Sequence, residues 1–241
     1  MKKTLSSLSK ENKTIILTIL VLTLVFGFND GKQTLTLESW LSNLIYVLFI
    51  SIVSFLAMVL GYKLAAKRYN ARAEIDIAGI QNFGLRQSSQ LKKRIPLGII
   101  LALVLMLLSS GKMFFTAIAS VKTSANRIGH RFHNITFFEE AVVAGAGITM
   151  VFILLLIFKA LNLQQGVTVT LWLIIWNLLP FGNLAGGKMF IGSRTLYILT
   201  IAFFVFVFLL LPVLPSILSV ILAVIFASAI AIFYFKKVEM S

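Results

Sequence analysis

Two histidines and two glutamates are the side chains of this chain whose types and spacing could bind a metal ion. His130 and His133 lie three positions apart, and Glu139 and Glu140 follow them. Imidazole and carboxylate groups are common zinc ligands. Arginines beside the histidines disfavour a bound cation, however, so we interpret residues 127–140 as an exposed basic segment. The two glutamates are expected at the amino terminus of the helix that follows, where negative charge is favourable.

The composition indicates a membrane protein. Hydrophobic residues form 59% of the 241 residues and charged residues 12%, with a mean hydropathy of +0.98. A soluble domain has roughly 45–50% apolar and about 25% charged residues. The net charge of +14 does not indicate nucleic-acid binding, because the basic side chains lie in short loops beside apolar runs, as membrane topology requires. The absence of cysteine excludes disulfides and thiolate metal sites.

Six apolar runs are predicted to cross the bilayer, since each approaches the ~20 residues that one helix needs. They are residues 14–28, 43–62, 141–158, 166–183, 195–211 and 216–235. The first follows four lysines but precedes no small-residue cleavage site, so we expect a retained span rather than a secretory signal. The predicted fold class is an all-α polytopic membrane protein, with residues 1–241 in a single integral membrane domain of the cell membrane.

Lysine and arginine predict the orientation of these spans, because they concentrate in cytoplasmic loops. The amino terminus and residues 63–94 are strongly basic, whereas residues 29–42 contain a single lysine. Residues 122–140 and the carboxyl-terminal tail are basic as well. We therefore expect both termini and residues 122–140 to be cytoplasmic.

The apolar residues 95–121 conflict with this orientation if they form one crossing, because the basic segment after them would then lie outside. The conflict disappears if the segment enters the membrane and returns to the same side. A helix over residues 95–110, a turn at 109–111 and an extended return over 113–121 fit its length. Non-helical backbone at membrane depth must be buried in protein or line a cavity. We therefore expect this re-entrant hairpin to pack against other spans.

Two segments far apart in the sequence form a recognisable pair of motifs. Residues 58–70 read Met-Val-Leu-Gly-Tyr-Lys-Leu-Ala-Ala-Lys-Arg-Tyr-Asn, and residues 177–188 read Asn-Leu-Leu-Pro-Phe-Gly-Asn-Leu-Ala-Gly-Gly-Lys. Together they resemble the two signatures of the site-2 protease family of intramembrane zinc proteases (M50-like), H-E-x-x-H-x-x-x-A-x-x-x-G and N-x-x-P-x-x-x-L-D-G. The matching residues are Ala66, Asn177, Pro180, Leu184 and Gly186. The resemblance covers about residues 45–192.

The positions that carry the chemistry in this family are all replaced. Met58 and Tyr62 stand at the two histidines, Val59 at the glutamate and Ala185 at the aspartate. In the family the histidines and the aspartate bind zinc, and the glutamate acts as the general base. Methionine is a poor zinc ligand, and valine and alanine cannot coordinate a metal. The resemblance therefore implies a pseudoprotease, without a metal, a cofactor or enzymatic activity.

The elements around the motifs follow the same resemblance. Residues 71–77 alternate between apolar and polar as a strand does, and prokaryotic relatives have a short strand at this place. Pro180 is expected to kink the span 166–183, because proline removes a backbone hydrogen bond. The family also uses its membrane hairpin to hold an unwound substrate. A protease-like core over about residues 43–192 and an extra carboxyl-terminal helix pair over 195–235 are therefore expected.

The predicted function is non-catalytic binding or scaffolding of another membrane protein or transmembrane segment, with this chain as a subunit of a membrane complex in contact with the lipid bilayer. The expected client-binding residues are Asn177, Pro180, Gly186, Phe115 and Ala117. A transport or channel component is an alternative, although none of the eight acidic residues lies in the middle of a predicted span. A divergent active metalloprotease is a further alternative, and it would require His130 and His133 to reach the core.

Overall fold

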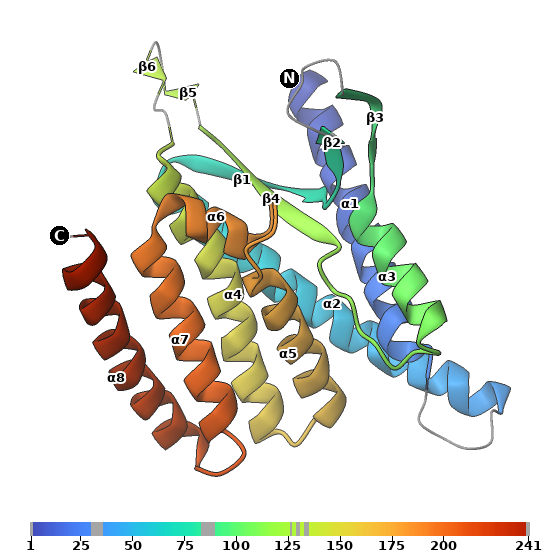
Figure 1. The fold of residues 1–241 in the computed structure, drawn as a ribbon. Coiled ribbons are helices and arrows are strands. Elements are labelled where there is room, and N and C mark those ends of the chain that lie inside the picture. The colour runs from blue at the N-terminus through green and yellow to red at the C-terminus, as the bar shows by residue number, and fades with distance from the viewer. Residues whose placement is uncertain are drawn as a thin grey trace.

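The computed structural model describes residues 2–29, 36–82, 90–125, 127–128, 131–132 and 135–239 (Figure 1). Most of these residues are helical. The helices are α1 (Lys2–Gly27), α2 (Leu37–Arg68), α3 (Leu97–Leu108), α4 (Phe137–Ala160), α5 (Gln164–Leu178), α6 (Ala185–Gly192), α7 (Arg194–Leu210), α8 (Ser216–Tyr234) and the short π-helix η2 (Phe235–Glu239). The strands are β1 (Ala71–Ile77), β2 (Ile80–Asn82), β3 (Gln90–Ile95), β4 (Ala119–Ala125), β5 (Arg127–Ile128) and β6 (Arg131–Phe132).

Three helices of the described chain are long and apolar enough to cross a membrane. They are Leu37–Arg68, Phe137–Ala160 and Ser216–Val238, and Leu97–Leu108 and Arg194–Leu210 are shorter apolar helices. This agrees with a membrane protein but not with six full-length spans. The physical reason is length, since α5 has 15 residues and α7 has 17, both fewer than the ~20 that cross a ~30 Å hydrocarbon core.

The helices form a layered bundle with α4 at its centre. α4 packs against α2, α5 and α6, while α1 and α3 lie at one edge and the α7–α8 pair lies at the other (Figure 1). The start of α1 and the end of α8 lie at the same end of the bundle, together with β1, β4 and α6. The connections between α4 and α5 and between α7 and α8 lie at the opposite end.

Glycines allow α2 and α4 to pack with their backbones in close contact. A Cβ atom on Gly61 would lie 2.6 Å from the carbonyl oxygen of Ala146 and 2.9 Å from the Cα of Gly147. A Cβ atom on Gly147 would overlap the ring of Tyr62. Small residues at a helix interface permit such close packing within a membrane, where apolar burial alone does not drive association.

The amino terminus of α4 confirms the place predicted for the two glutamates. Thr136 Oγ1 accepts a hydrogen bond from the Glu139 amide at 3.2 Å, and the Thr136 amide donates to Glu139 Oε2 at 2.8 Å. This reciprocal pair is a capping box. Glu140 forms an ion pair with Lys188 of α6, with 3.4 Å between Oε2 and Nζ. His130 and His133 lie outside the described residues.

β1 and β4 form an antiparallel pair that joins the end of α2 to the hairpin. Ala71 is opposite Ala125 and Ile77 is opposite Ala119. The strand predicted at residues 71–77 is therefore confirmed, and Ala71, Ala73 and Ile75 are its buried side chains. The all-α expectation is incomplete, because the described residues also contain the two-stranded pairs β2–β3 and β5–β6.

Pro180 ends a helix instead of kinking one, so the prediction of a continuous span over residues 166–183 is wrong. α5 ends at Leu178, and Leu179 has extended backbone with φ −63° and ψ 137°. A residue before proline avoids helical geometry, and proline itself lacks an amide donor. Gly182 follows with a positive φ of 50°, and the chain becomes helical again in α6. α6 continues to Gly192, directly before α7.

Candidate functional site

The predicted helix, tight reversal and extended return of the hairpin are present. α3 ends at Leu108, and the chain turns through Ser110 and Gly111, whose φ angles are +52° and +75°. The Gly111 amide donates to the carbonyl of Met106 at 2.8 Å and closes the helix end. The chain then runs back beside α3 and enters β4 (Figure 1). This agrees with the predicted turn at residues 109–111.

Two hydrogen bonds between α5 and the extended return hold the return in place. Trp176 Nε1 donates to the carbonyl of Phe114 at 2.6 Å, and Thr116 Oγ1 donates to the carbonyl of Trp172 at 2.9 Å. The rings of Phe115 and Trp176 also pack at 4.5 Å between their centroids. Non-helical backbone inside a membrane requires such partners, because lipid supplies no hydrogen bonds.

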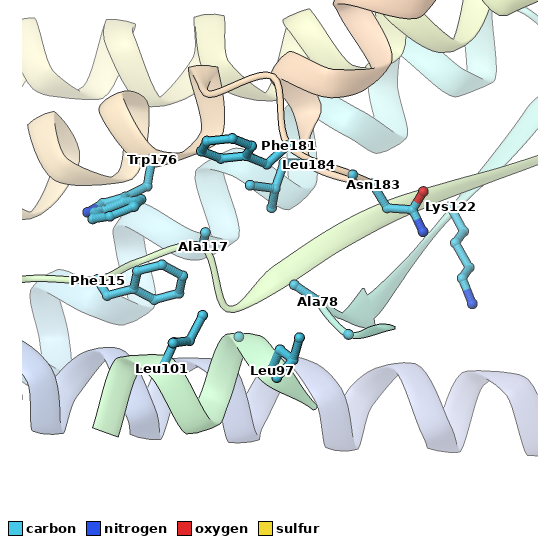
Figure 2. Close-up of a pocket in the computed structure, with 13 residues that line it drawn as sticks. Ala78, Leu97, Leu101, Phe115, Ala117, Lys122, Trp176, Phe181, Asn183 and Leu184 are labelled. Carbon is cyan, nitrogen blue, oxygen red and sulfur yellow. The ribbon is translucent and has the colours of Figure 1, made fainter. Parts of the chain in front are cut away.

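A cleft of about 750 Å³ lies between the hairpin and the loop that connects α5 to α6. Figure 2 shows the return segment along this cleft, with α3 on one side and the α5–α6 loop on the other. The side chains and backbone that line it come from α3, the return, β4, the connection between β1 and β2, the end of α5 and the loop. They include Ala78, Leu97, Gly98, Leu101, Phe115, Ala117, Lys122, Trp176, Phe181, Asn183 and Leu184.

The cleft has an aromatic end and a polar end. Trp176 and Phe115 lie together at one end, and Asn183 and Lys122 lie toward the other (Figure 2). Lys122 forms an ion pair with Asp76, with 2.5 Å between Nζ and Oδ2, across the β1–β4 pair. An occupant of this cleft would therefore place apolar groups beside the rings and polar groups beside the sheet.

The five expected client-binding residues do not all face this cleft. Phe115 and Ala117 line it, whereas Asn177, Pro180 and Gly186 are not among its lining residues. Asn177 is buried and its Nδ2 donates to the carbonyl of Leu173 at 2.9 Å. Pro180 is exposed, and Gly186 packs against the carbonyl of Leu178. Of the matching residues of the second motif, Leu184 lines the cleft, together with Phe181, Gly182 and Asn183 of the same loop.

The sequence interpretation missed the cleft residues of the loop and of α3, and it also missed Ala78, Gly79, Lys122 and Trp176. Phe181 and Asn183 line the cleft because α5 stops before Pro180. The sequence interpretation placed both residues in a continuous helix and therefore did not predict their role in the cleft. Leu97 and Leu101 lie on α3, directly after Pro96. The loop group and the α3 group each follow a proline, and this was the available signal for them, since proline marks chain breaks.

The four positions that would carry zinc chemistry in the family are buried side chains. Met58, Val59 and Tyr62 lie in the core on α2, and Ala185 is the first residue of α6. α2 and α6 approach the same turn of α4. Gly61 lies against Ala146 and Gly147, and the methyl group of Met189 would lie 3.3 Å from a Cβ on Gly145. In the described part of the chain, no group of three or more histidine, cysteine, aspartate or glutamate side chains could hold a metal ion.

No family model matches this chain, and comparisons with curated proteins and with solved structures give no match either. The resemblance to the site-2 proteases therefore depends on the two motifs and on their placement in this fold.

Proposed function

We propose that this protein is a catalytically inactive, site-2-protease-like membrane protein that binds a segment of another membrane protein in the cleft beside its hairpin. The observation that carries the proposal is the cleft itself. Its volume is about 750 Å³, and one wall is an extended chain whose position is fixed by Trp176 and Thr116. Specific binding pockets combine an apolar lining with a few placed polar groups, and this cleft has that composition.

The proposal includes six crossings, by α1, α2, α4, α5, α7 and α8, with α3 as a re-entrant helix and both termini in the cytoplasm. Two observations support it. The start of α1 and the end of α8 lie at the same end of the bundle (Figure 1), and the end of α2 and the strands β1 and β4, which carry basic residues, lie at that end too. α1 and α5 are short on apolar residues for full spans, and locally thinner bilayer accommodates such helices.

The absence of catalysis in the proposal follows from Met58, Val59, Tyr62 and Ala185. These side chains supply neither a zinc ligand set nor a base. Protein purified in detergent is expected to contain far less than one zinc per chain by elemental analysis. A stoichiometric zinc that is lost after His130→Ala or His133→Ala would instead favour a divergent metalloprotease.

Photo-crosslinking tests the binding function. A photoreactive residue at Leu101 or Phe181 should join to one discrete membrane protein in native membranes, because both side chains line the cleft. The matched controls are Val205 and Ile225, which are exposed apolar residues of α7 and α8 outside the cleft.

A second variant makes the crosslinking result specific. Ala117→Phe would fill the cleft, and it should remove the crosslink from position 181 without changing the oligomeric state of the folded chain. If the same adducts form at the control positions, or if they persist when the cleft is filled, the cleft is not the binding site and the proposal is wrong.

A further inference from the structure

The loop between α5 and α6, residues 179–184, forms one wall of the cleft, and we call it the cleft loop. Phe181, Asn183 and Leu184 are among its lining residues. Two of its backbone hydrogen bonds are local: the Phe181 amide donates to the carbonyl of Leu179 at 2.8 Å, and the Leu184 amide donates to the carbonyl of Phe181 at 3.1 Å. Bonds within a loop fix its shape but not its place in the molecule. The position of the cleft loop therefore depends on the groups that pack against it from other elements.

Two glycines of α6 pack against the cleft loop and against the end of α5. A Cβ atom on Gly186 would overlap the carbonyl oxygen of Leu178, and a Cβ atom on Gly187 would lie 2.5 Å from the carbonyl oxygen of Gly182. α6 therefore supports the loop by backbone contact. At this contact it has no side chain that could donate a hydrogen bond to Leu178.

The carbonyl of Leu178 receives its hydrogen bond from α7. The last carbonyls of a helix have no partner within the helix, and Leu178 is the last residue of α5. Pro180 and the positive φ of Gly182 prevent the helix from continuing. The hydroxyl of Tyr197, a residue only 7% exposed, donates to the Leu178 carbonyl at 3.3 Å. Without this donor a buried carbonyl would lose its partner in surroundings that supply little water.

The ring of Tyr197 is fixed by α6 and by the packing of α7 on the bundle. Tyr197 and Phe190 of α6 pack edge to face, with 5.4 Å between their ring centroids. Two turns further along α7, Phe204 packs in the same way against Phe152 of α4, also at 5.4 Å. α8 in turn packs chiefly against α7. The α7–α8 pair, which follows the residues that resemble the protease family, thus reaches the end of α5 and the start of the cleft loop through Tyr197.

We propose that Tyr197 is a positioning residue of the cleft, through which the α7–α8 pair holds the cleft loop in place. What the cleft binds rests on the function proposed above, whereas the position of the loop does not. A buried tyrosine commonly has a hydrogen-bond partner, so the bond by itself would be ordinary packing. Its acceptor gives it a further role, because Leu178 is where α5 ends and the loop begins. Loss of the hydroxyl should let the loop move, while Trp176 and Thr116 still hold the extended return on the opposite wall.

Hydrogen exchange of the full chain in mild detergent tests this role. Tyr197→Phe keeps the ring and removes the donor, so the amides of Phe181 and Leu184 should exchange about tenfold faster, as the loss of one hydrogen bond predicts. The amides of β4 should keep their rates. Tyr197→4-aminophenylalanine retains a donor and should restore slow exchange, a rescue that ring packing alone would not produce. The matched control is Tyr62→Phe, which removes a buried hydroxyl that has no hydrogen-bond partner among the described residues and should leave the loop unchanged.

Crosslinking then connects the loop to the client. In the Tyr197→Phe chain, the adduct from a photoreactive residue at Phe181 should fall several-fold, whereas the adduct from Leu101 on α3 should be retained. Unchanged exchange of the loop amides, or equal acceleration in the Tyr62→Phe chain, would overturn the role of Tyr197 whatever the crosslinks show. Faster exchange that 4-aminophenylalanine reverses, without an adduct at either position in the unaltered chain, would support the positioning role and contradict the proposed function.

Discussion

The ring of Tyr62 lies where α2 and α4 are closest, and it fits there only because residue 147 is a glycine. The site that would hold a histidine in a zinc protease is thus occupied by a large side chain in a packed interface. The side chain at position 62 and the residue at position 147 are therefore coupled through packing. Two predictions follow from this coupling at the level of single residues.

Gly147→Ala should destabilise the protein by roughly 1–3 kcal/mol, because the new Cβ overlaps the Tyr62 ring and forces the helices to shift. The control is Gly145→Ala, whose Cβ would meet only the flexible end of Met189 at 3.3 Å. The free energy of unfolding in mild detergent is the measurement. Tyr62→Leu should recover part of the loss in the Gly147→Ala background, and a loss that is independent of residue 62 would contradict this packing.

Restoring the ligands should not restore activity. The quadruple variant Met58→His, Val59→Glu, Tyr62→His and Ala185→Asp rebuilds the family's set of zinc ligands and its base. It does not introduce the groups that would hydrogen-bond to the imidazoles and orient them, and the lack of such groups typically reduces zinc affinity about 10–100-fold. It also introduces ionisable groups at buried positions, at a cost in stability. We expect weak zinc uptake and no cleavage of a model transmembrane substrate. A folded variant that binds no zinc would show that these positions do not converge.

At the scale of elements, the strand at residues 71–77 and the reversal at 109–111 were accessible from the sequence because each depends on local pattern. Alternation marks β1, and the Ser-Ser-Gly turn, together with the charge after it, marks the hairpin. The pairing of β1 with β4 was not accessible, because it joins segments about 50 residues apart by backbone bonds alone. The loop that lines the cleft was missed because Pro180 was predicted to kink a continuous helix, whereas it ends the helix. Whether a proline kinks or ends a helix depends on the residues that pack around it.

The indole hydrogen bond of Trp176 should contribute measurably to holding the extended return in place. Trp176→Phe removes the donor to Phe114 and leaves its carbonyl without that partner, for an expected loss of about 1–3 kcal/mol. Hydrogen exchange of the amides at residues 113–118 should become faster. Trp172→Phe is the control, because the Thr116 hydroxyl donates to its backbone carbonyl and its indole forms no hydrogen bond with the described residues. Equal effects of the two substitutions would argue that packing alone fixes the return.

At the scale of the whole molecule, the ion pairs of the described residues lie at the end of the bundle that holds the start of α1 and the end of α8. Lys63 pairs with Glu11 at 2.8 Å, and two further pairs join β1 to β4 and α4 to α6. Charge segregation of this kind was readable from the sequence, since membrane topology requires it. The number of full-length spans could not be predicted from the sequence, because hydropathy alone does not distinguish a 15-residue helix from a helix that crosses the membrane.

A cysteine at Ser124 tests which side this end faces. The chain has no native cysteine, and Ser124 is an exposed residue of β4 opposite Arg72. A membrane-impermeant thiol reagent should label Ser124→Cys only when the cytoplasmic side is accessible. Asn162→Cys, in the turn between α4 and α5, should be labelled only from outside. Labelling of both positions from the same side would exclude the proposed topology.

The arrangement of α7 and α8 determines when the cleft becomes complete during translation. α8 packs chiefly against α7, and every segment that lines the cleft has been synthesised once Leu184 has left the ribosome. Because chains generally fold from the amino terminus as they emerge, the cleft can form while the last two helices are still being made. Under the proposed function, a client could therefore enter the cleft before synthesis of the chain ends.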